Sequence, residues 1–236
     1  MIIFGIHTCE EAFKSGKCGI RKVFLQNGRK IPPFLDGFCD FIRVDENEIG
    51  KMLPKGSVHQ GIALDIDESK YFIDISYFKT TSENCCIAIL DGVVDPHNFG
   101  AIIRTAAVFG VSCIITSEKS SCKLTGTVMK VSSGGIEYVS LCIVKNLSTA
   151  IKTLQEYGFW VISLAENGKQ YLNELDLKGK ICLVLGAEEG GIRRLQKEKS
   201  DYIAKLPTSS QFSTLNVSSA AAVAFYEKWR QGGIDN

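Results

Sequence analysis

Short apolar runs alternate with helix-like segments from Cys85 to Leu206, and this alternation limits the possible folds more than any other feature of the sequence. The runs are continuously apolar, as in strands that are buried on both faces of a sheet. The predicted strands are Cys86–Leu90, Ser112–Thr116, Glu137–Ile143, Phe159–Leu164, Ile181–Leu185 and Tyr202–Leu206. The predicted helices are Asn98–Phe109, Lys123–Ser132, Leu147–Tyr157, Gly191–Lys199 and Val217–Trp229. Strands that alternate with helices of this length predict a parallel sheet covered on both faces.

Residues 1–66 contain the same element types in shorter segments, and we interpret them as a small α/β unit of their own. A first helix is expected to end at Gly16, and Asp45 followed by Glu48 is typical of the capping box that begins another. The predicted strands are Val23–Leu25, Phe41–Val44 and a third that follows the turn at His59–Gly61. Residues 67–84 are polar and lack periodicity, so they predict a linker between domains at 1–66 and 85–236.

The stretch Lys205–Glu227 places a polar loop, Thr208–Thr214, directly after a predicted strand and before a helix rich in Ala. Open α/β sheets bind their ligands at the carboxyl ends of their strands. The small side chains of the helix indicate that another segment packs closely against it. The stretch is therefore a candidate ligand site, although an ordinary surface loop before a tightly packed helix would have the same pattern.

Two further stretches carry polar groups at predicted strand ends. In the first, Asn98 is expected to cap the following helix, Gly100 to allow close approach of another backbone, and Arg104 to reach back toward Asn98. Such a group of donors suits an anion such as phosphate. In the second, Gly186 exposes backbone at a strand end, and Glu188 could orient Arg104. A helix cap with an exposed arginine and a generic strand-to-helix loop are the alternatives.

The 236 residues carry a net charge of only +1, so the protein has no overall basic field. A nucleic-acid partner would need a local patch. One run lacks acidic residues and is the candidate RNA-binding surface: Lys14, Lys17, Arg21, Lys22, Arg29 and Lys30. A solvated face without a partner is the alternative interpretation of this run.

The nine cysteines have neither C-x-x-C spacing nor a nearby cluster of histidines, so they predict buried free thiols and no metal site. The first residues do not resemble a leader peptide, and no apolar run reaches the ~18 residues of a membrane span. We therefore expect a cytoplasmic protein. The sequence also lacks the glycine-rich dinucleotide motif, the P-loop and the G-x-S-x-G elbow, which counts against three common α/β enzyme classes.

Taken together, three motifs in order make the pattern specific: N-x-G-x-x-x-R from Asn98, L-G-A-E-x-G from Leu185, and L-N-V-S from Leu215. They resemble the SpoU/TrmH family of RNA ribose 2′-O-methyltransferases over about residues 85–230. Phe4–His7 and His59–Ile62 are more weakly similar to the L30e-like RNA-binding module of one branch. That branch methylates a guanosine in large-subunit (23S) ribosomal RNA.

The resemblance implies a deep trefoil knot in the second domain, a homodimer, and S-adenosylmethionine as cofactor. By position it implies these cofactor-binding residues: Leu185, Gly186, Leu206, Leu215 and Asn216. The implied catalytic residues are Asn98, Arg104, Glu188, Thr214 and Asn216, and Arg104 joins the basic run as an RNA contact.

The chain departs from the family pattern at Thr214 and in the stretch Pro207-Thr208-Ser209-Ser210, where the family has P-M-x-G. Thr214 replaces the usual serine and keeps its hydroxyl, whereas Ser210 replaces a glycine, which puts the shape of the donor-binding loop in question. Arg104 could act as the base for the ribose hydroxyl or as a grip on the neighbouring phosphate. A tRNA methyltransferase of the same family, a non-catalytic RNA-binding protein and an unrelated nucleotide-binding α/β enzyme are the competing hypotheses.

Overall fold

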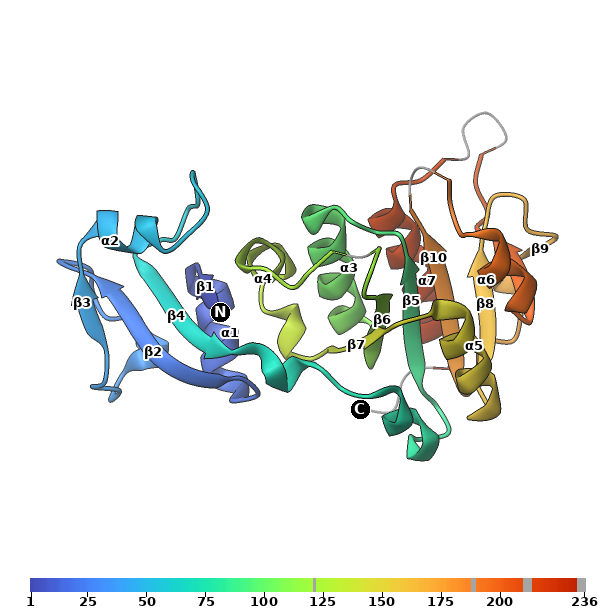
Figure 1. Ribbon diagram of the computed structural model, residues 1–236, viewed down its shortest axis with the longest axis horizontal. Coiled ribbons are helices and arrows are strands. Elements are labelled where there is room, and N and C mark those ends of the chain that lie inside the picture. The colour runs from blue at the N-terminus through green and yellow to red at the C-terminus, as the bar shows by residue number, and fades with distance from the viewer. Residues whose placement is uncertain (121, 188–189, 210–213, 233–236) are drawn as a thin grey trace.

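The chain forms two β-sheets that lie side by side, one from its first quarter and one from the rest (Figure 1). This computed structural model describes residues 1–120, 122–187, 190–209 and 214–232. None of the helices in these ranges has the length and apolar content that crossing a bilayer would need.

The first sheet has four strands in the order β1-β4-β2-β3, and its pairs are antiparallel except for β2 with β3. Its elements are β1 (Ile2–Phe4), α1 (Ile6–Ser15), β2 (Gly19–Gln26), β3 (Ile42–Val44), α2 (Glu46–Lys51) and β4 (Ile62–Asp67). The capping box of Asp45 with Glu48 is confirmed, and Gly16 ends α1 in the left-handed conformation, as expected. Strand β1 was not predicted, because a run of three residues is too short to show a period.

The second sheet has seven strands in the order β7-β6-β5-β10-β8-β11-β9, and every pair is parallel. Its strands are β5 (Cys86–Asp91), β6 (Cys113–Ser117), β7 (Ser140–Val144), β8 (Trp160–Leu164), β9 (Gln170–Tyr171), β10 (Ile181–Gly186) and β11 (Tyr202–Lys205). The helices are α3 (Pro96–Val108), α4 (Gly126–Ser132), α5 (Leu147–Glu156), α6 (Arg194–Lys199) and α7 (Val217–Gly232). The predicted parallel α/β sheet is therefore confirmed.

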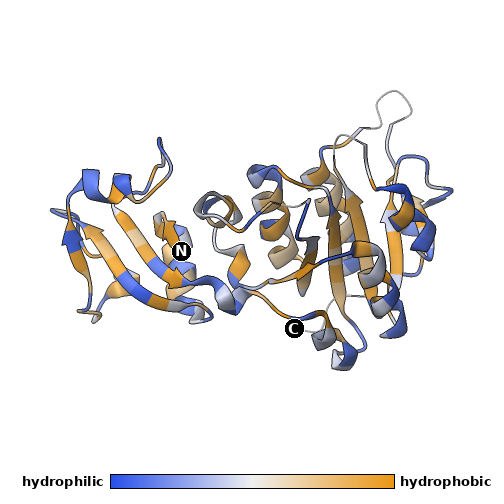
Figure 2. Ribbon diagram, in the orientation of Figure 1, coloured by the Kyte–Doolittle hydropathy of each residue, from blue (hydrophilic) through white to orange (hydrophobic). Residues whose placement is uncertain are grey.

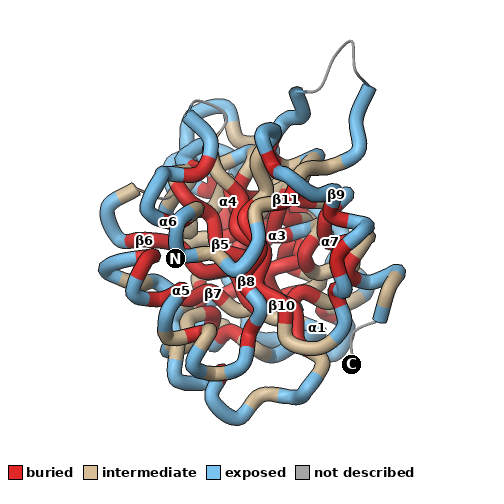
Figure 3. Tube along the Cα trace, turned by 90° about the vertical axis from the view of Figure 1, so that its right-hand side faces the viewer, coloured by how far each residue is buried: buried red, intermediate tan, exposed pale blue. Residues whose placement is uncertain are grey.

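Both faces of this sheet are covered, because alternate strand residues enter different cores. On β5, Ala88 and Leu90 pack with α3, α4 and α7, whereas Ile87 and Ile89 pack with α5. Figure 2 shows hydrophobic residues along these strands and hydrophilic ones on the outer surfaces of the helices. Figure 3 shows the central strands buried beneath an exposed outer layer.

The segment 67–84, which we predicted as a linker, is more ordered than its polar sequence indicates. It forms the 3-10 turns η2 (Glu68–Tyr71) and η3 (Ile75–Thr80), and it buries Tyr71 and Phe78 completely. The Tyr71 hydroxyl donates to Oε1 of buried Glu137 at 2.5 Å. One hydrophobic core continues from the first sheet into the second, so the two parts pack directly on each other.

Two local predictions were wrong in detail. Helix α3 begins at Pro96 and its N-cap is Asp95, whose carboxylate accepts from the amides of His97 and Asn98. Asn98 is therefore inside the first turn and does not cap it. Glu137 lies in the 3-10 turn η4 (Gly135–Glu137) and not at the start of a strand, because Gly134 and Gly135 favour a turn.

Candidate functional site

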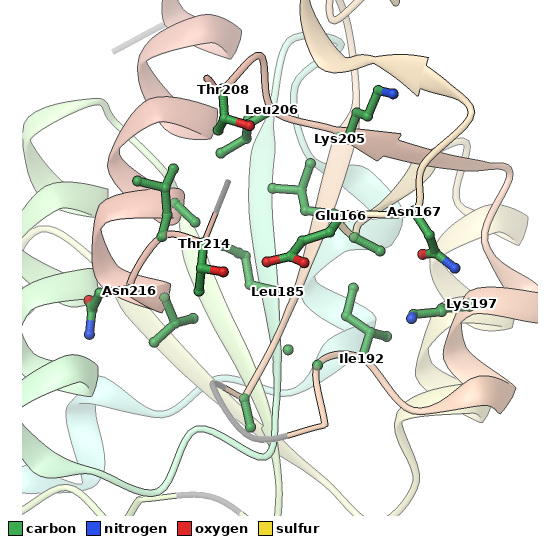
Figure 4. Close-up of a pocket in the computed structure, with 18 of the residues that line it drawn as sticks. Glu166, Asn167, Leu185, Ile192, Lys197, Lys205, Leu206, Thr208, Thr214 and Asn216 are labelled. Carbon is green, nitrogen blue, oxygen red and sulfur yellow. The ribbon is translucent and has the colours of Figure 1, made fainter. Parts of the chain in front are cut away.

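A cavity of about 900 Å³ opens at the carboxyl ends of β8, β10 and β11, where parallel sheets place ligands (Figure 4). Its walls come from five segments: the β8–β9 connection, the end of β10 with the turn after it, helix α6, the chain after β11, and the start of α7. The apolar lining includes Leu164, Leu185, Ile192, Leu206, Leu215 and Val217. The mixture of apolar walls with a few polar groups is typical of a small-molecule site.

Gly186 makes the floor of this cavity possible. A Cβ atom on this residue would lie 2.1 Å from the carbonyl carbon of Gly191 and 2.2 Å from the nitrogen of Ile192. The amide of Gly191 donates to the carbonyl of Ala187, which folds the chain back onto the strand end. Only glycine allows the two backbone segments to touch here. The glycine predicted to expose backbone at this strand end is therefore required by the close approach of residues 191 and 192.

A second close approach positions an acid that the sequence analysis missed. A Cβ on Gly168 would lie 2.4 Å from the carbonyl carbon of Ala204, so the β8–β9 connection lies directly on β11. The connection turns the carboxylate of Glu166 into the cavity, toward the side of Thr214 (Figure 4). The only signal in the sequence is the Glu-Asn-Gly turn after a predicted strand, which is too common to single out.

Asn216 joins the two polar stretches across the site. Its side-chain amide donates a 3.0 Å hydrogen bond to Oδ1 of Asn98, and its own Oδ1 accepts from the amide and hydroxyl of Ser218. In Figure 4 the Asn216 side chain points away from the cavity centre, whereas the Thr214 hydroxyl points into it. The contact therefore connects the start of α3 with the start of α7.

Most of the predicted cofactor-binding and catalytic residues meet at this cavity. It is lined by Leu185, Gly186, Leu206, Thr214, Leu215 and Asn216. Asn98 reaches it through Asn216. Glu188 and Ser210 lie outside the described residues. Gly100 packs against α4 as expected, because a Cβ there would lie 2.7 Å from Cβ of Val131.

Arg104 does not line this cavity. It is exposed in a separate recess of about 390 Å³, together with His7 and Glu11 of α1 and the turn at Ser133–Gly135. The reason is helix geometry. Arg104 lies six residues after Asn98, so the α-helix has rotated about 600° between them, and the two side chains leave the helix in directions about 120° apart. Within one chain, the expected pairing of Arg104 with Asn98 is therefore not formed.

The basic run is spread over several surfaces of the first sheet. The Lys17 ammonium donates to the carbonyls of Ile136 and Val139. Lys14 pairs with Glu10 at 2.7 Å, and Arg21 pairs with Asp67 at 3.5 Å. Lys22, Arg29 and Lys30 are exposed. Within the described residues, no three His, Cys, Asp or Glu side chains gather as a metal site.

Comparison with known families gives two matches that together cover most of the chain. The model of the SpoU rRNA Methylase family matches residues 86–226. The model described as RNA 2′-O ribose methyltransferase substrate binding matches residues 2–72.

Individual relatives match over nearly their whole length. The chain is 34% identical over 239 residues to the 23S rRNA (guanosine-2′-O-)-methyltransferase RlmB of Pseudomonas aeruginosa, covering 97% of this chain and 96% of the relative. It is 35% identical to RlmB of Shewanella oneidensis, covering 98% and 97%. Among solved structures, the SpoU methyltransferase AviRb of Streptomyces viridochromogenes with AdoMet has a TM-score of 0.83 at 17% identity, covering 98% of this chain and 89% of that one.

Proposed function

The chain belongs to the SpoU rRNA methylase family, and we infer that it transfers a methyl group from S-adenosylmethionine to a ribose 2′-hydroxyl of RNA. The substrate is a guanosine of large-subunit ribosomal RNA, as the names of the full-length relatives indicate. One observation supports this function most directly. Three motif stretches, at residues 98, 185–186 and 214–216, converge on one cavity at the strand ends.

The cavity fits the methyl donor. Its volume lies within the usual range for ligand sites, and its apolar walls suit an adenine ring. Backbone groups at Gly186 and Leu206 would hold the ring edge, and the Glu166 carboxylate would accept from donor hydroxyl or ammonium groups. When bound, the donor supplies a methyl group already activated on a sulfonium centre.

The protein must then orient the ribose and manage its proton, because a ribose hydroxyl is a poor nucleophile. Arg104 has an exposed guanidinium with no ion pair among the described residues. A guanidinium resists deprotonation and binds phosphate through two donors. We therefore favour a role in gripping the phosphate and stabilising the developing alkoxide over a role as base. Asn98, held by Asn216, would position the ribose.

A homodimer would bring Arg104 of one copy close to the donor cavity of the other copy. The end of α3 and helix α7 share an apolar patch, in which Val108, Val223, Tyr226 and Trp229 are exposed and Phe109 is half-buried. The ring of Phe109 lies 5.9 Å from that of Tyr226, and Trp229 is 49% exposed. Val108 also lines the recess of Arg104. Pairing of two copies over this patch would carry Arg104 of each copy toward the donor cavity of the other.

The finer fold assignments belong to the same proposal. Strand β11 is separated from β10 by β8, yet α7 packs against α3 and β10. The chain after β11 must therefore pass back over the sheet, which is the kind of crossing that a deep trefoil knot requires. The mixed sheet of residues 1–67 supports an L30e-like RNA-binding domain, with the methyltransferase domain beginning at residue 85. An rRNA substrate agrees with the expected cytoplasmic location.

Methyl transfer from tritium-labelled S-adenosylmethionine to separate pools of unmodified large-subunit rRNA, small-subunit rRNA and tRNA tests the proposal. We expect label in large-subunit rRNA. Label confined to tRNA would favour the alternative substrate class. An absence of label, together with an absence of donor binding by calorimetry, would favour the non-catalytic alternative.

A further inference from the structure

The recess that holds Arg104 has walls from both parts of the chain. His7 and Glu11 come from α1 of the first sheet, Arg104 and Ala107 from α3, and Tyr138 from the turn after η4. Residues 2–72 match a substrate-binding model and residues 86–226 a methylase model. The recess is therefore a place where an RNA-recognition element and a catalytic element face the same space.

Two glycines hold these walls together. A Cβ on Gly134 would lie 2.5 Å from Cβ and Cγ of Glu11, and a Cβ on Gly135 would lie 2.9 Å from Cα of Arg104. Gly134 also has a φ of +86°, which a residue with a side chain would rarely adopt. The turn is therefore pressed against α1 on one side and α3 on the other, so His7 and Arg104 keep a fixed relationship.

The polar groups of the recess favour an anion. The carboxylate of Glu11 already accepts from the Tyr138 hydroxyl at 2.8 Å, and it shares the Lys14 ammonium, 3.9 Å away, with Glu10. His7 and Arg104 are exposed, and neither side chain has a hydrogen bond or ion pair among the described residues. An imidazole and a guanidinium that face one recess without protein partners suit a phosphate group.

We propose that this recess binds the RNA backbone at the target nucleotide, with His7 and Arg104 donating to the same phosphate group. This inference rests on the proposed function and adds a residue to it. The first sheet would then contact the target nucleotide itself as well as RNA farther from the reaction site. By holding the phosphate, His7 would help to position the reacting ribose. At about 390 Å³ the recess has room for a single nucleotide of a strand whose bases are splayed apart.

The variants His7→Ala and His7→Gln test this assignment, since the glutamine amide can still donate to a phosphate oxygen. Lys51→Ala is the control, because this lysine is exposed on α2 and outside the recess. For His7→Ala we expect the equilibrium Kd for RNA, measured in the absence of methyl transfer, to rise about tenfold, the usual scale for losing a hydrogen bond to a charged group. The affinity for S-adenosylmethionine, measured by calorimetry, should be unchanged.

His7→Gln should recover most of the RNA affinity, and Lys51→Ala should behave as wild type. The RNA affinity of Arg104→Ala should depend less on salt, by about 0.7 in the logarithmic slope for one phosphate contact on a single strand. A wild-type Kd for RNA in His7→Ala, or an unchanged salt slope in Arg104→Ala, would overturn the assignment. RNA affinity is measured without turnover, so a wild-type protein that methylates no RNA contradicts the proposed function and leaves this test intact.

Discussion

Asn216 donates a 3.0 Å hydrogen bond to Asn98, a residue 118 positions earlier in the chain. The bond fixes the first turn of α3 against the residue that precedes α7, and the start of α7 lines the donor cavity. The side chain proposed to orient the ribose is thus held by a residue of the cavity wall.

Replacing Asn98 or Asn216 by alanine should remove the same interaction, so their effects on kcat/KM should not add. A neutral hydrogen bond contributes about 0.5–1.5 kcal/mol, which predicts a coupling of that size in a double-mutant cycle. The exposed Ser219 of α7 supplies the control pair. Asn98→Ala with Ser219→Ala should be additive, and full additivity in the Asn98–Asn216 cycle would contradict the account.

Gly186→Ala should weaken donor binding while the fold survives. The new methyl group would overlap the backbone of Gly191 and Ile192, and overpacking of this kind costs about 1–3 kcal/mol. We expect donor affinity by calorimetry to fall at least about tenfold. Gly50→Ala is the control, because nothing lies within 4 Å of its added Cβ on α2. The Gly50→Ala variant should bind the donor normally. Normal binding by Gly186→Ala would show that the backbone contact at Gly186 does not form the floor of the donor site.

Arg104→Ala should reduce turnover and leave donor binding nearly intact, because Arg104 does not line the cavity of its own chain. If each copy serves the site of the other, mixing Arg104→Ala with Asn216→Ala chains should restore activity. Random pairing gives half heterodimers with one complete site each, or about a quarter of wild-type activity. Mixed chains that stay as inactive as either variant would place both residues in one site of one chain.

The buried thiols should make the protein less stable at alkaline pH. Burial raises the pKa of Cys86 to about 12, and it also raises the pKa of Cys113 and Cys182 well above the usual value. The unfolded thiols ionise near pH 8.5 and the folded ones do not, so this stability is full below about pH 8.5 and is lost above it.

The predicted loss is up to about 1.4 kcal/mol per pH unit for each buried thiol. It can be measured as the free energy of urea unfolding at pH 7.5 and 9.5 under reducing conditions. Cys86→Ala should reduce the slope, whereas the exposed Cys39→Ala should leave it unchanged. Equal slopes in all three proteins would show that Cys86 does not contribute.

The sequence predicted the second sheet well because its strands are continuously apolar and its helices are amphipathic or capped. The Leu147 helix with its Asn146 cap is one example, since the side chain accepts from the amide of Thr149 as expected. The order of the strands could not be predicted in this way. The position of β10 between β5 and β8 depends on contacts between residues far apart in sequence.

The site was predicted in part, for similar physical reasons. Gly186, Leu206 and Leu215, which the family resemblance implied as cofactor-binding residues, line one cavity. Glu166 was missed because its orientation depends on the approach of Gly168 to β11. The position of Arg104 beside His7 depends on how the first sheet packs against α3, which no local pattern encodes.

The most direct test of the central claim is to identify the labelled nucleoside. Large-subunit rRNA methylated with isotope-labelled S-adenosylmethionine is digested to nucleosides and analysed by mass spectrometry. The account predicts that the label is found in 2′-O-methylguanosine and that Arg104→Ala greatly reduces it. Label on a base, or on the ribose of a nucleoside other than guanosine, would contradict it.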